Sequence, residues 1–239
     1  MSILNRNFTN KIRFVLDQLL PPILRDSKLL MRFLIKLLYK DATDDFMSFK
    51  EKAPFLTDEE YKHIYDKVAH ANIDRPTDCN KESIDKIIQN ISGASVLEVA
   101  TGRGYLAGEI AKNQNLSVTA TDMLIAPETI ARYPNVHFQQ AFIENLPFSD
   151  HSFDTVVCTH CLEHVRDIPR CMQELRRVAK KRLIIVVPMQ RPYKYTFDLH
   201  INFFPYIHSF LQAITPPKNN DTVKCMELKG DIYYQEDLK

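Results

Sequence analysis

The sequence has almost no excess of either charge: its 239 residues include 31 Lys and Arg and 30 Asp and Glu, a formal net charge of +1. Proteins that bind nucleic acid without sequence preference need a basic excess, so the overall charge gives no support for such a partner. Cysteine is scarce and odd in number, with five residues and no disulfide framework. The first residues also lack the apolar core and cleavage site of a signal peptide. We therefore expect a cytoplasmic protein.

Glycine is scarce as well, with five residues, and two of them, Gly102 and Gly104, stand close together. They follow an apolar run, Val96 to Val99, that suits a buried strand, and a helical pattern begins at Tyr105. Glycine allows backbone torsions and close ligand approach that a Cβ would forbid. A strand, loop and helix of this kind place the amide groups of the loop at the carboxyl edge of a sheet, where open α/β folds bind their ligands.

Two acidic residues narrow the choice of ligand. Glu98 lies inside the strand end, where a carboxylate favours a cationic partner and would repel a pyrophosphate. Asp122 closes the next apolar run, Leu116 to Thr121, at the position where an acid accepts hydrogen bonds from ribose hydroxyls. A ligand with a ribose and a positive charge but no phosphate fits both acids, and S-adenosylmethionine (SAM) has these properties.

The glycine stretch resembles the first motif of the class I SAM-dependent methyltransferases, whose usual form is acid-x-Gly-x-Gly-x-Gly. Further matches follow in the family's order over roughly residues 91 to 239: Val96-Leu-Glu-Val-Ala-Thr-Gly-Arg-Gly104, Thr119-Ala-Thr-Asp122, Glu144-Asn-Leu-Pro-Phe-Ser-Asp-His-Ser-Phe-Asp154, Leu162-Glu-His-Val165 and Glu174-Leu-Arg-Arg-Val178. The resemblance implies a Rossmann-like α/β fold, with a mainly parallel seven-stranded sheet and helices on both faces. It also implies SAM as cofactor and S-adenosylhomocysteine as product.

The resemblance assigns the cofactor site to one set of residues: Glu98, Ala100, Thr101, Gly102, Gly104, Tyr105, Asp122, Met123, Phe142, Ile143 and Thr159. Two positions depart from the family pattern. Ala100 stands where the first glycine is usual. Phe142 stands where many relatives carry an acid near the adenine, so we expect the Ile143 amide and apolar contacts to bind the adenine instead.

The pattern of apolar runs supports the same fold. Strands are predicted over 95–99, 116–121, 136–140, 155–158 and 182–187, with helices over 105–113 and 167–179. Such alternation is typical of a mainly parallel sheet with helices on both faces. Two extended stretches, 223–228 and 232–235, predict an antiparallel hairpin at the sheet edge. We interpret residues 91–239 as the methyltransferase domain and residues 1–90 as a helical N-terminal extension or cap.

The first forty residues are strongly basic. Helices are predicted over 8–20 and 27–40, and Thr57 with Glu60 forms a capping-box pattern before a third helix. In the second helix Lys28, Arg32, Lys36 and Lys40 recur every four residues on an otherwise apolar rod. This helix either packs on the catalytic domain or a second subunit, or lies on an anionic membrane and brings the site to a lipid-linked acceptor. The oligomeric state stays open.

Methyl transfer from a sulfonium is an in-line displacement in which positioning does most of the work. No metal is expected, and Cys158-Thr-His-Cys161 lacks the second ligand pair of a zinc site. A hydroxyl acceptor gains from a general base, and His160 and His200 are the candidates. The alternative for His160 is a polar wall of the cofactor pocket. Residues 191–204, which mix aromatic and hydrogen-bonding groups, form either part of an acceptor pocket or a surface loop.

The leading functional hypothesis is O-methylation of a small-molecule, sugar or lipid-linked acceptor. One alternative is a tRNA or RNA methyltransferase that uses the basic N-terminal region, and another is a non-catalytic SAM-binding scaffold. The fourth strand is followed by Cys-Thr-His-Cys instead of the Asn/Asp-Pro-Pro-aromatic motif of amino-directed DNA methyltransferases, which disfavours DNA. A nicotinamide enzyme is the third class, but Gly102, Gly104 and Gly108 are one residue too widely spaced for Gly-x-Gly-x-x-Gly.

Overall fold

A computed structural model of the protein describes residue 15 and residues 19–39, 42–69, 76–195, 197–218 and 220–238. The chain forms two compact units: unit 1 comprises Met1–Arg75 and Gln190–Phe203, and unit 2 comprises Pro76–Met189 and Phe204–Lys239. This division differs from the expected boundary at residue 90. The predicted helix over 8–20 lies almost wholly outside the described residues.

Unit 2 is built on a seven-stranded sheet in the order β3-β2-β1-β4-β5-β7-β6. The strands are β1 (Ser95–Val99), β2 (Ser117–Asp122), β3 (Val136–Gln140), β4 (Phe153–Thr159), β5 (Ala179–Pro188), β6 (Val223–Leu228) and β7 (Asp231–Asp237). The first five run parallel, whereas β7 is antiparallel to both β5 and β6. The mainly parallel sheet and the antiparallel hairpin at its edge are thus confirmed.

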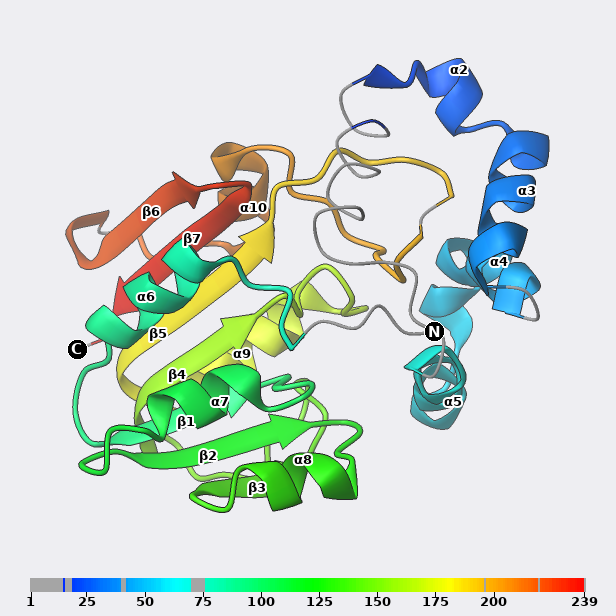
Figure 1. The fold of residues 1–239 in the computed structure, drawn as a ribbon. Helices are drawn as coiled ribbons and strands as arrows, with labels where there is room; N and C mark the ends of the chain where they lie inside the picture. Colours follow the sequence, from blue (N-terminus) through cyan, green and yellow to red (C-terminus); the bar gives the residue numbers. More distant parts are fainter. Residues whose placement is uncertain are drawn as a thin grey trace. The chain divides into compact units, whose positions relative to one another are not determined.

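Helices cover both faces of this sheet (Figure 1). On one face lie α6 (Lys81–Gln89) and α7 (Tyr105–Ile110), and on the other lie α9 (Ile168–Val178) and α10 (Ile207–Ile214). The short α8 (Pro127–Arg132) precedes β3, and the 3-10 turn η4 (Asn220–Thr222) precedes β6. The sequence pattern did not predict α8 or α10, because each contains too few turns to show a clear helical period.

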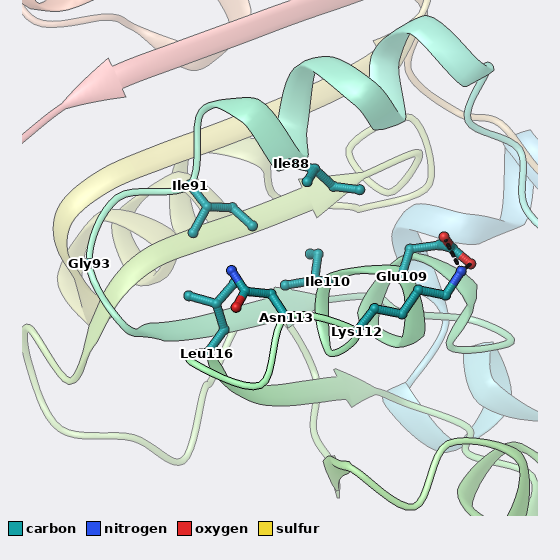
Figure 2. A pocket seen from close by; sticks show the side chains of 8 residues that line it. All are labelled: Ile88, Ile91, Gly93, Glu109, Ile110, Lys112, Asn113 and Leu116. Carbon is teal, nitrogen blue, oxygen red and sulfur yellow. Dashed lines mark hydrogen bonds and ion pairs between the residues drawn. The ribbon is translucent and has the colours of Figure 1, made fainter.

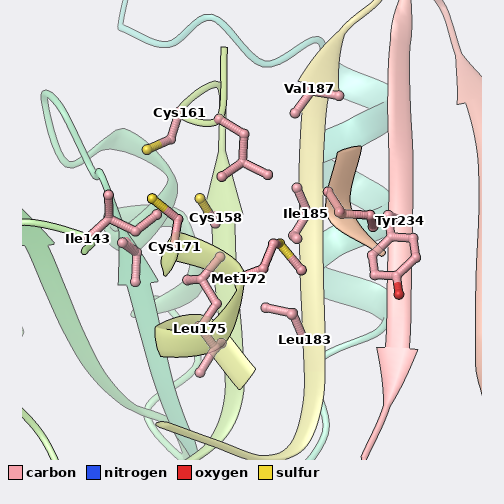
Figure 3. Packing of buried hydrophobic residues seen from close by; sticks show 14 of the residues in the cluster. Ile143, Cys158, Cys161, Cys171, Met172, Leu175, Leu183, Ile185, Val187 and Tyr234 are labelled. Carbon is pink, nitrogen blue, oxygen red and sulfur yellow. The ribbon is translucent and has the colours of Figure 1, made fainter. Parts of the chain in front are cut away.

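The two faces of the sheet carry two separate apolar cores, because successive strand residues point to opposite sides. On β1, Val96 packs with α6 and α7, whereas Leu97 and Val99 pack with α9 and α10. Figure 3 shows the second core, in which Met172 and Leu175 of α9 meet the β5 side chains. Helix α6 belongs to unit 2 because its Ile87 is fully buried in the first core.

The described helices of unit 1 are α2 (Pro22–Arg25), α3 (Lys28–Tyr39), α4 (Thr43–Lys52), η3 (Ala53–Phe55) and α5 (Asp58–Ala69). Helix α3 matches the predicted helix over 27–40. The capping box before α5 is present: Glu60 N donates to Thr57 Oγ1 at 3.3 Å, and Thr57 N donates to Glu60 Oε2 at 2.8 Å. Among the described residues, no helix combines the length and apolar character needed to cross a membrane.

The segment 190–203 belongs to unit 1 because side chains of the helices bind its backbone. Lys194 N donates to Asp26 Oδ1 at 2.9 Å, and Tyr39 Oη donates to the Phe197 carbonyl. Lys50 Nζ donates to the Tyr193 carbonyl and lies 4.3 Å from the centre of the Phe203 ring. The segment that follows β5 is therefore an integral part of the helical unit.

In unit 2, the β4 residue Asp154 fastens the chain that enters β1. Its Oδ2 accepts hydrogen bonds from Ala94 N at 2.8 Å and Ser95 N at 3.3 Å, and its Oδ1 pairs with Lys181 Nζ at 2.8 Å. The Lys181 ammonium and the Ala94 amide hold the pKa of Asp154 well below its usual range. The carboxylate thus replaces backbone partners that the turn before β1 does not supply.

We expect Asp154→Asn to lower the free energy of unfolding by about 1–3 kcal/mol at pH 7, the scale of a lost charged hydrogen bond. A depressed pKa gives stability that is present above the unfolded pKa and is lost as the pH falls through the folded one. The difference between the two proteins should therefore shrink below about pH 4, in urea unfolding at several pH values. Asp85→Asn, in an exposed pair with Lys81, is the control and should cost under about 0.5 kcal/mol. An equal loss at both sites would contradict the assigned role of Asp154.

Candidate functional site

The candidate site lies at the edge of the sheet where β1, β2 and β4 end. In the parallel register Val99 pairs with both Thr121 and Cys158. The loop that begins at Ala100 therefore starts level with Asp122 and Thr159. These segments are the ones to which the sequence assigned the cofactor, and the sheet brings them to one edge.

The loop itself contains three residues with left-handed backbone: Ala100 at φ 60°, Gly102 at φ 56° and Gly104 at φ 72°. At Ala100 this conformation costs about 1–2 kcal/mol, because a Cβ is present. A Cβ on Gly102 would meet no protein atom within 4 Å, so only its torsion calls for glycine. A Cβ on Gly104 would lie 2.9 Å from Thr129, so packing against α8 requires glycine as well.

Glu98 holds this loop through two hydrogen bonds of its side chain. The side chain is 2% exposed, and its Oε2 accepts hydrogen bonds from Thr101 Oγ1 at 2.5 Å and from Ala107 N at 2.9 Å. The Ala107 amide lies in the first turn of α7, where backbone N–H groups lack helical partners and a negative charge is favourable. Burial raises the pKa of Glu98 to about 7, although the two hydrogen bonds oppose the shift. The partners that the structure gives Glu98 are thus a hydroxyl and a helix amide, where the sequence favoured a cation.

Asp122 joins the end of β2 to the glycine loop. Its Oδ2 accepts from Gly102 N at 2.8 Å, and its Oδ1 accepts from Leu124 N at 3.0 Å. Desolvation raises the pKa of Asp122, and these amides counter the shift. A carboxylate offers about four lone-pair sites, so the side chain keeps the capacity to accept a ribose hydroxyl. Next in the chain, the Met123 carbonyl accepts from Gln140 Nε2.

The remaining predicted cofactor residues differ in burial. Thr101 and Thr159 are 7% and 8% exposed, and Tyr105 is half-buried at the start of α7. Phe142 is half-buried in the turn after β3, whereas the Ile143 side chain is buried in the core of the α9 face (Figure 3). The Ile143 side chain is therefore taken up by the core, and contact of its amide with adenine stays a prediction.

His160 directly follows β4 and is anchored there, since its backbone N donates to the Val186 carbonyl at 2.8 Å. Its ring faces two carboxylates: Nδ1 lies 3.5 Å from Glu163 Oε1, and Nε2 lies 3.6 Å from Asp231 Oδ1. Burial alone lowers the pKa of His160, but Asp231, Cys79 and Glu163 raise it well above its usual value. Both ring nitrogens thus face a carboxylate side chain. The predicted role of His160 as a base stays a prediction, and its environment favours another role.

His200 belongs to unit 1. The side chain is 5% exposed, and its Nδ1 lies 2.5 Å from Gln190 Oε1. That amide oxygen can only accept, so the contact favours a hydrogen on Nδ1 of the ring. The nearby Tyr193 and Tyr195 are also buried within unit 1. Their predicted part in an acceptor pocket stays a prediction.

Two side-chain groups escaped the sequence analysis. Lys50, on α4, places its ammonium over the Tyr193 and Phe203 rings, and burial lowers its pKa to about 8. Cys79 and Asp231 gather with His160 near the start of α6. A lone lysine, cysteine or aspartate gives no signal in a sequence, because what distinguishes it is a contact with a distant segment.

The cysteine pair Cys158 and Cys161 and a cavity at the other edge of the sheet play other roles in the fold. Cys158 and Cys161 both belong to the core of the α9 face, and a hydrogen bond to Cys158, together with burial, raises the pKa of the Cys161 thiol (Figure 3). A cavity of about 470 Å³ lies between α6 and α7 (Figure 2). Its residues Gly93 and Leu116 precede β1 and β2, so it opens at the amino edge of the sheet, opposite the candidate site.

The pKa of Glu98 predicts how stability depends on pH. Between about pH 4.3, the usual value, and about pH 7 the folded protein keeps a proton that the unfolded chain loses, so the stability of the wild type falls as pH rises. Glu98→Gln removes this effect. The free energy of unfolding of the variant minus that of the wild type should therefore rise by on the order of 2 kcal/mol between pH 4.5 and pH 8. Urea unfolding at several pH values measures this difference. Glu109→Gln on α7 is the control, and its difference from the wild type should not change with pH. Parallel pH profiles for wild type and Glu98→Gln would refute the buried neutral carboxyl.

Part of this chain is similar to known methyltransferases. The model of a family described as "Methyltransferase domain" matches residues 97–187. Demethylmenaquinone methyltransferase of Chlorobaculum parvum is 38% identical over 89 residues, which cover 36% of each chain. Ubiquinone biosynthesis O-methyltransferase of Rickettsia bellii is 27% identical over 172 residues, which cover 64% of this chain and 70% of that protein. The chain thus spans little more than a third of the first relative's length.

Among solved structures, a SAM-dependent methyltransferase from Aquifex aeolicus has a TM-score of 0.52 and 17% identity, over 66% of this chain and 89% of that one. At this identity the likeness concerns the fold. Residues 97–187 thus match a methyltransferase domain, and the sheet around them has the fold of a SAM-dependent methyltransferase.

Proposed function

We propose that the protein transfers the methyl group of SAM to an oxygen atom of a small-molecule acceptor, and that this acceptor is lipid-linked. The observation that carries the proposal is the loop at the end of β1, which Glu98 fixes to α7 and Asp122 fixes to β2. A loop fixed at both ends holds its amide groups in one arrangement before the cofactor binds, which lowers the entropic cost of binding.

In this proposal the cofactor lies along the carboxyl edge of the sheet. The exposed backbone at Gly102 accepts the close approach of the ligand, and Asp122 accepts hydrogen bonds from the ribose. Phe142 and the Ile143 amide contact the adenine, and Ala100, Thr101, Tyr105, Met123 and Thr159 complete the walls. A hydroxyl acceptor gains from a general base, and His160 and His200 stay the predicted candidates for that role.

The class of acceptor is inferred from two observations. The relatives are named for demethylmenaquinone methylation and for an O-methyltransferase step of ubiquinone biosynthesis, which favours an oxygenated ring. The second observation is the exposure of apolar side chains on helix α3. Its Met31 and Ile35 are fully buried, whereas Leu29, Phe33 and Leu37 are 84%, 61% and 63% exposed.

This exposed apolar row on α3 runs beside a basic one. Lys28, Arg32 and Lys36 are exposed and precede Leu29, Phe33 and Leu37 by one residue each. A helix with apolar side chains next to cations suits an anionic membrane surface, in which the apolar groups enter the headgroup region. We therefore propose that α3 places the enzyme on a membrane that contains the acceptor.

The enzymatic test uses SAM labelled in its methyl group and anionic vesicles that contain a hydroxylated quinone with an apolar tail. Label in an O-methyl product supports the proposal. Label that appears instead in added RNA would replace it with the RNA alternative. Tight SAM binding without transfer to lipid, sugar or small-molecule fractions of a cell extract would favour the non-catalytic scaffold.

For Asp122→Ala, we expect SAM affinity to fall by about 1–3 kcal/mol, or about fivefold to 150-fold, because the ribose loses its acceptor and the Gly102 amide loses its anchor. Isothermal titration calorimetry measures the dissociation constant, and circular dichroism verifies the fold. Glu109→Ala, in the cavity at the opposite edge, should bind SAM like the wild type. Unchanged affinity in Asp122→Ala would place the ribose elsewhere.

For Phe33→Asp, we expect at least a tenfold loss of partitioning to anionic vesicles in a flotation assay, because burying a Phe side chain contributes about 1.5–3 kcal/mol. Ile130→Asp is the matched control, since Ile130 is 49% exposed on α8, and its partitioning should not change. If the wild type fails to float, or if both variants float equally well, α3 does not bind the membrane.

A further inference from the structure

Three segments of unit 2 bring a thiol, an imidazole and a carboxylate together. Cys79 lies just before α6, His160 just after β4, and Asp231 is the first residue of β7. The ligand atoms of these three side chains all lie within 4.8 Å of one another. Cys79 is fully buried, Asp231 is 6% exposed, and the His160 side chain is 11% exposed. The cluster is thus an interior feature of the sheet edge.

The spacing within the cluster does not suit direct hydrogen bonds. His160 Nε2 lies 3.6 Å from Asp231 Oδ1, and within the described part of the chain this buried nitrogen has no hydrogen-bond partner. Zinc binds nitrogen and carboxylate oxygen at about 2.0–2.2 Å in tetrahedral geometry, so two such ligands of one ion are separated by roughly 3.3–3.5 Å. The observed separation is close to that value.

The surroundings of the cluster orient its ligand atoms. Asp231 Oδ2 accepts from Asn80 Nδ2 at 2.7 Å and from Ser83 Oγ at 3.0 Å, which leaves Oδ1 facing His160. On the other side of the ring, Nδ1 faces Glu163, which is 1% exposed. Among the described residues, neither Glu163 oxygen has a hydrogen-bond partner. A carboxylate behind the second nitrogen of a histidine and hydrogen bonds to the ligating carboxylate are the usual outer partners of a bound metal.

We propose that Cys79, His160 and Asp231 form a zinc site that fixes the start of α6 to the ends of β4 and β7. The thiolate and the carboxylate balance the charge of the ion, and a sulfur and imidazole set selects zinc over magnesium or calcium. A water molecule supplies the fourth ligand. This site departs from the expectation of a metal-free protein, and it gives His160 a role as ligand in place of general base.

The test begins with full-length, tag-free protein that is stripped of metal and then titrated with zinc. We expect one zinc per chain by elemental analysis, and a higher melting temperature for the loaded protein. Cobalt in place of zinc should give a thiolate-to-cobalt charge-transfer absorption. Cys79→Ser should abolish this absorption, and Cys79→Ser and Asp231→Asn should each weaken zinc binding at least tenfold. Cys225→Ser, at a half-buried cysteine on β6, is the matched control and should behave like the wild type.

Two results would overturn the proposal. If the wild type takes up neither zinc nor cobalt and its melting temperature does not respond to zinc, the cluster is a metal-free pair of His160 with its carboxylates. If Cys79→Ser and Asp231→Asn keep wild-type zinc affinity, the ion binds elsewhere. The wild-type titration does not depend on any variant, so a variant that fails to fold leaves the proposal testable.

Discussion

The buried carboxylate of Glu98 is the constraint on which the candidate site depends. It lies at the end of a central strand, so its charge is desolvated, and it is stabilised by the Thr101 hydroxyl and the Ala107 amide. These two bonds fasten the loop to the strand on one side and to α7 on the other. Every second residue from Ala100 to Gly104 has left-handed backbone. These torsions can persist because the surrounding contacts fix them. The order of the loop is therefore a property of the protein and precedes any ligand.

The helical unit, unit 1, depends on contacts between side chains and the backbone of a distant segment. Its helices are held to the segment 190–203 by hydrogen bonds between side chains and backbone groups, and the Lys50 ammonium also lies over the Tyr193 and Phe203 rings. Removing a lysine charge partly from water is costly, which the lowered pKa reflects, and the carbonyl and ring faces offset that cost. The segment that leaves β5 thus ends the sheet and also completes the helical unit.

The sequence left open whether helix α3 packs against the protein or lies on a membrane, and the burial of its side chains bears on both. Met31 and Ile35 pack inside unit 1, whereas Leu29, Phe33 and Leu37 remain exposed. The apolar surface of this helix is larger than packing within the described unit requires, and large exposed apolar patches usually mark interaction surfaces. One face therefore satisfies the packing interpretation, and the opposite face supports the membrane proposal.

The sequence by itself determined the parallel sheet with its hairpin edge, the glycine loop, the position of Asp122 and helix α3. These features depend on local periodicity, on glycine torsions and on motifs that lie within a few residues of one another. Tertiary structure alone decided that Glu98 binds a helix amide, that His160 faces Glu163 and Asp231, and that residues 190–203 join the helical unit. The contact of His160 with Asp231 joins segments that are distant in the chain. The contacts of Glu98 with Ala107 and of His160 with Glu163 depend on how the glycine loop and the turn after β4 fold. Strand order and register create such neighbours, and single residues such as Cys79 or Lys50 carry no local pattern that would reveal them.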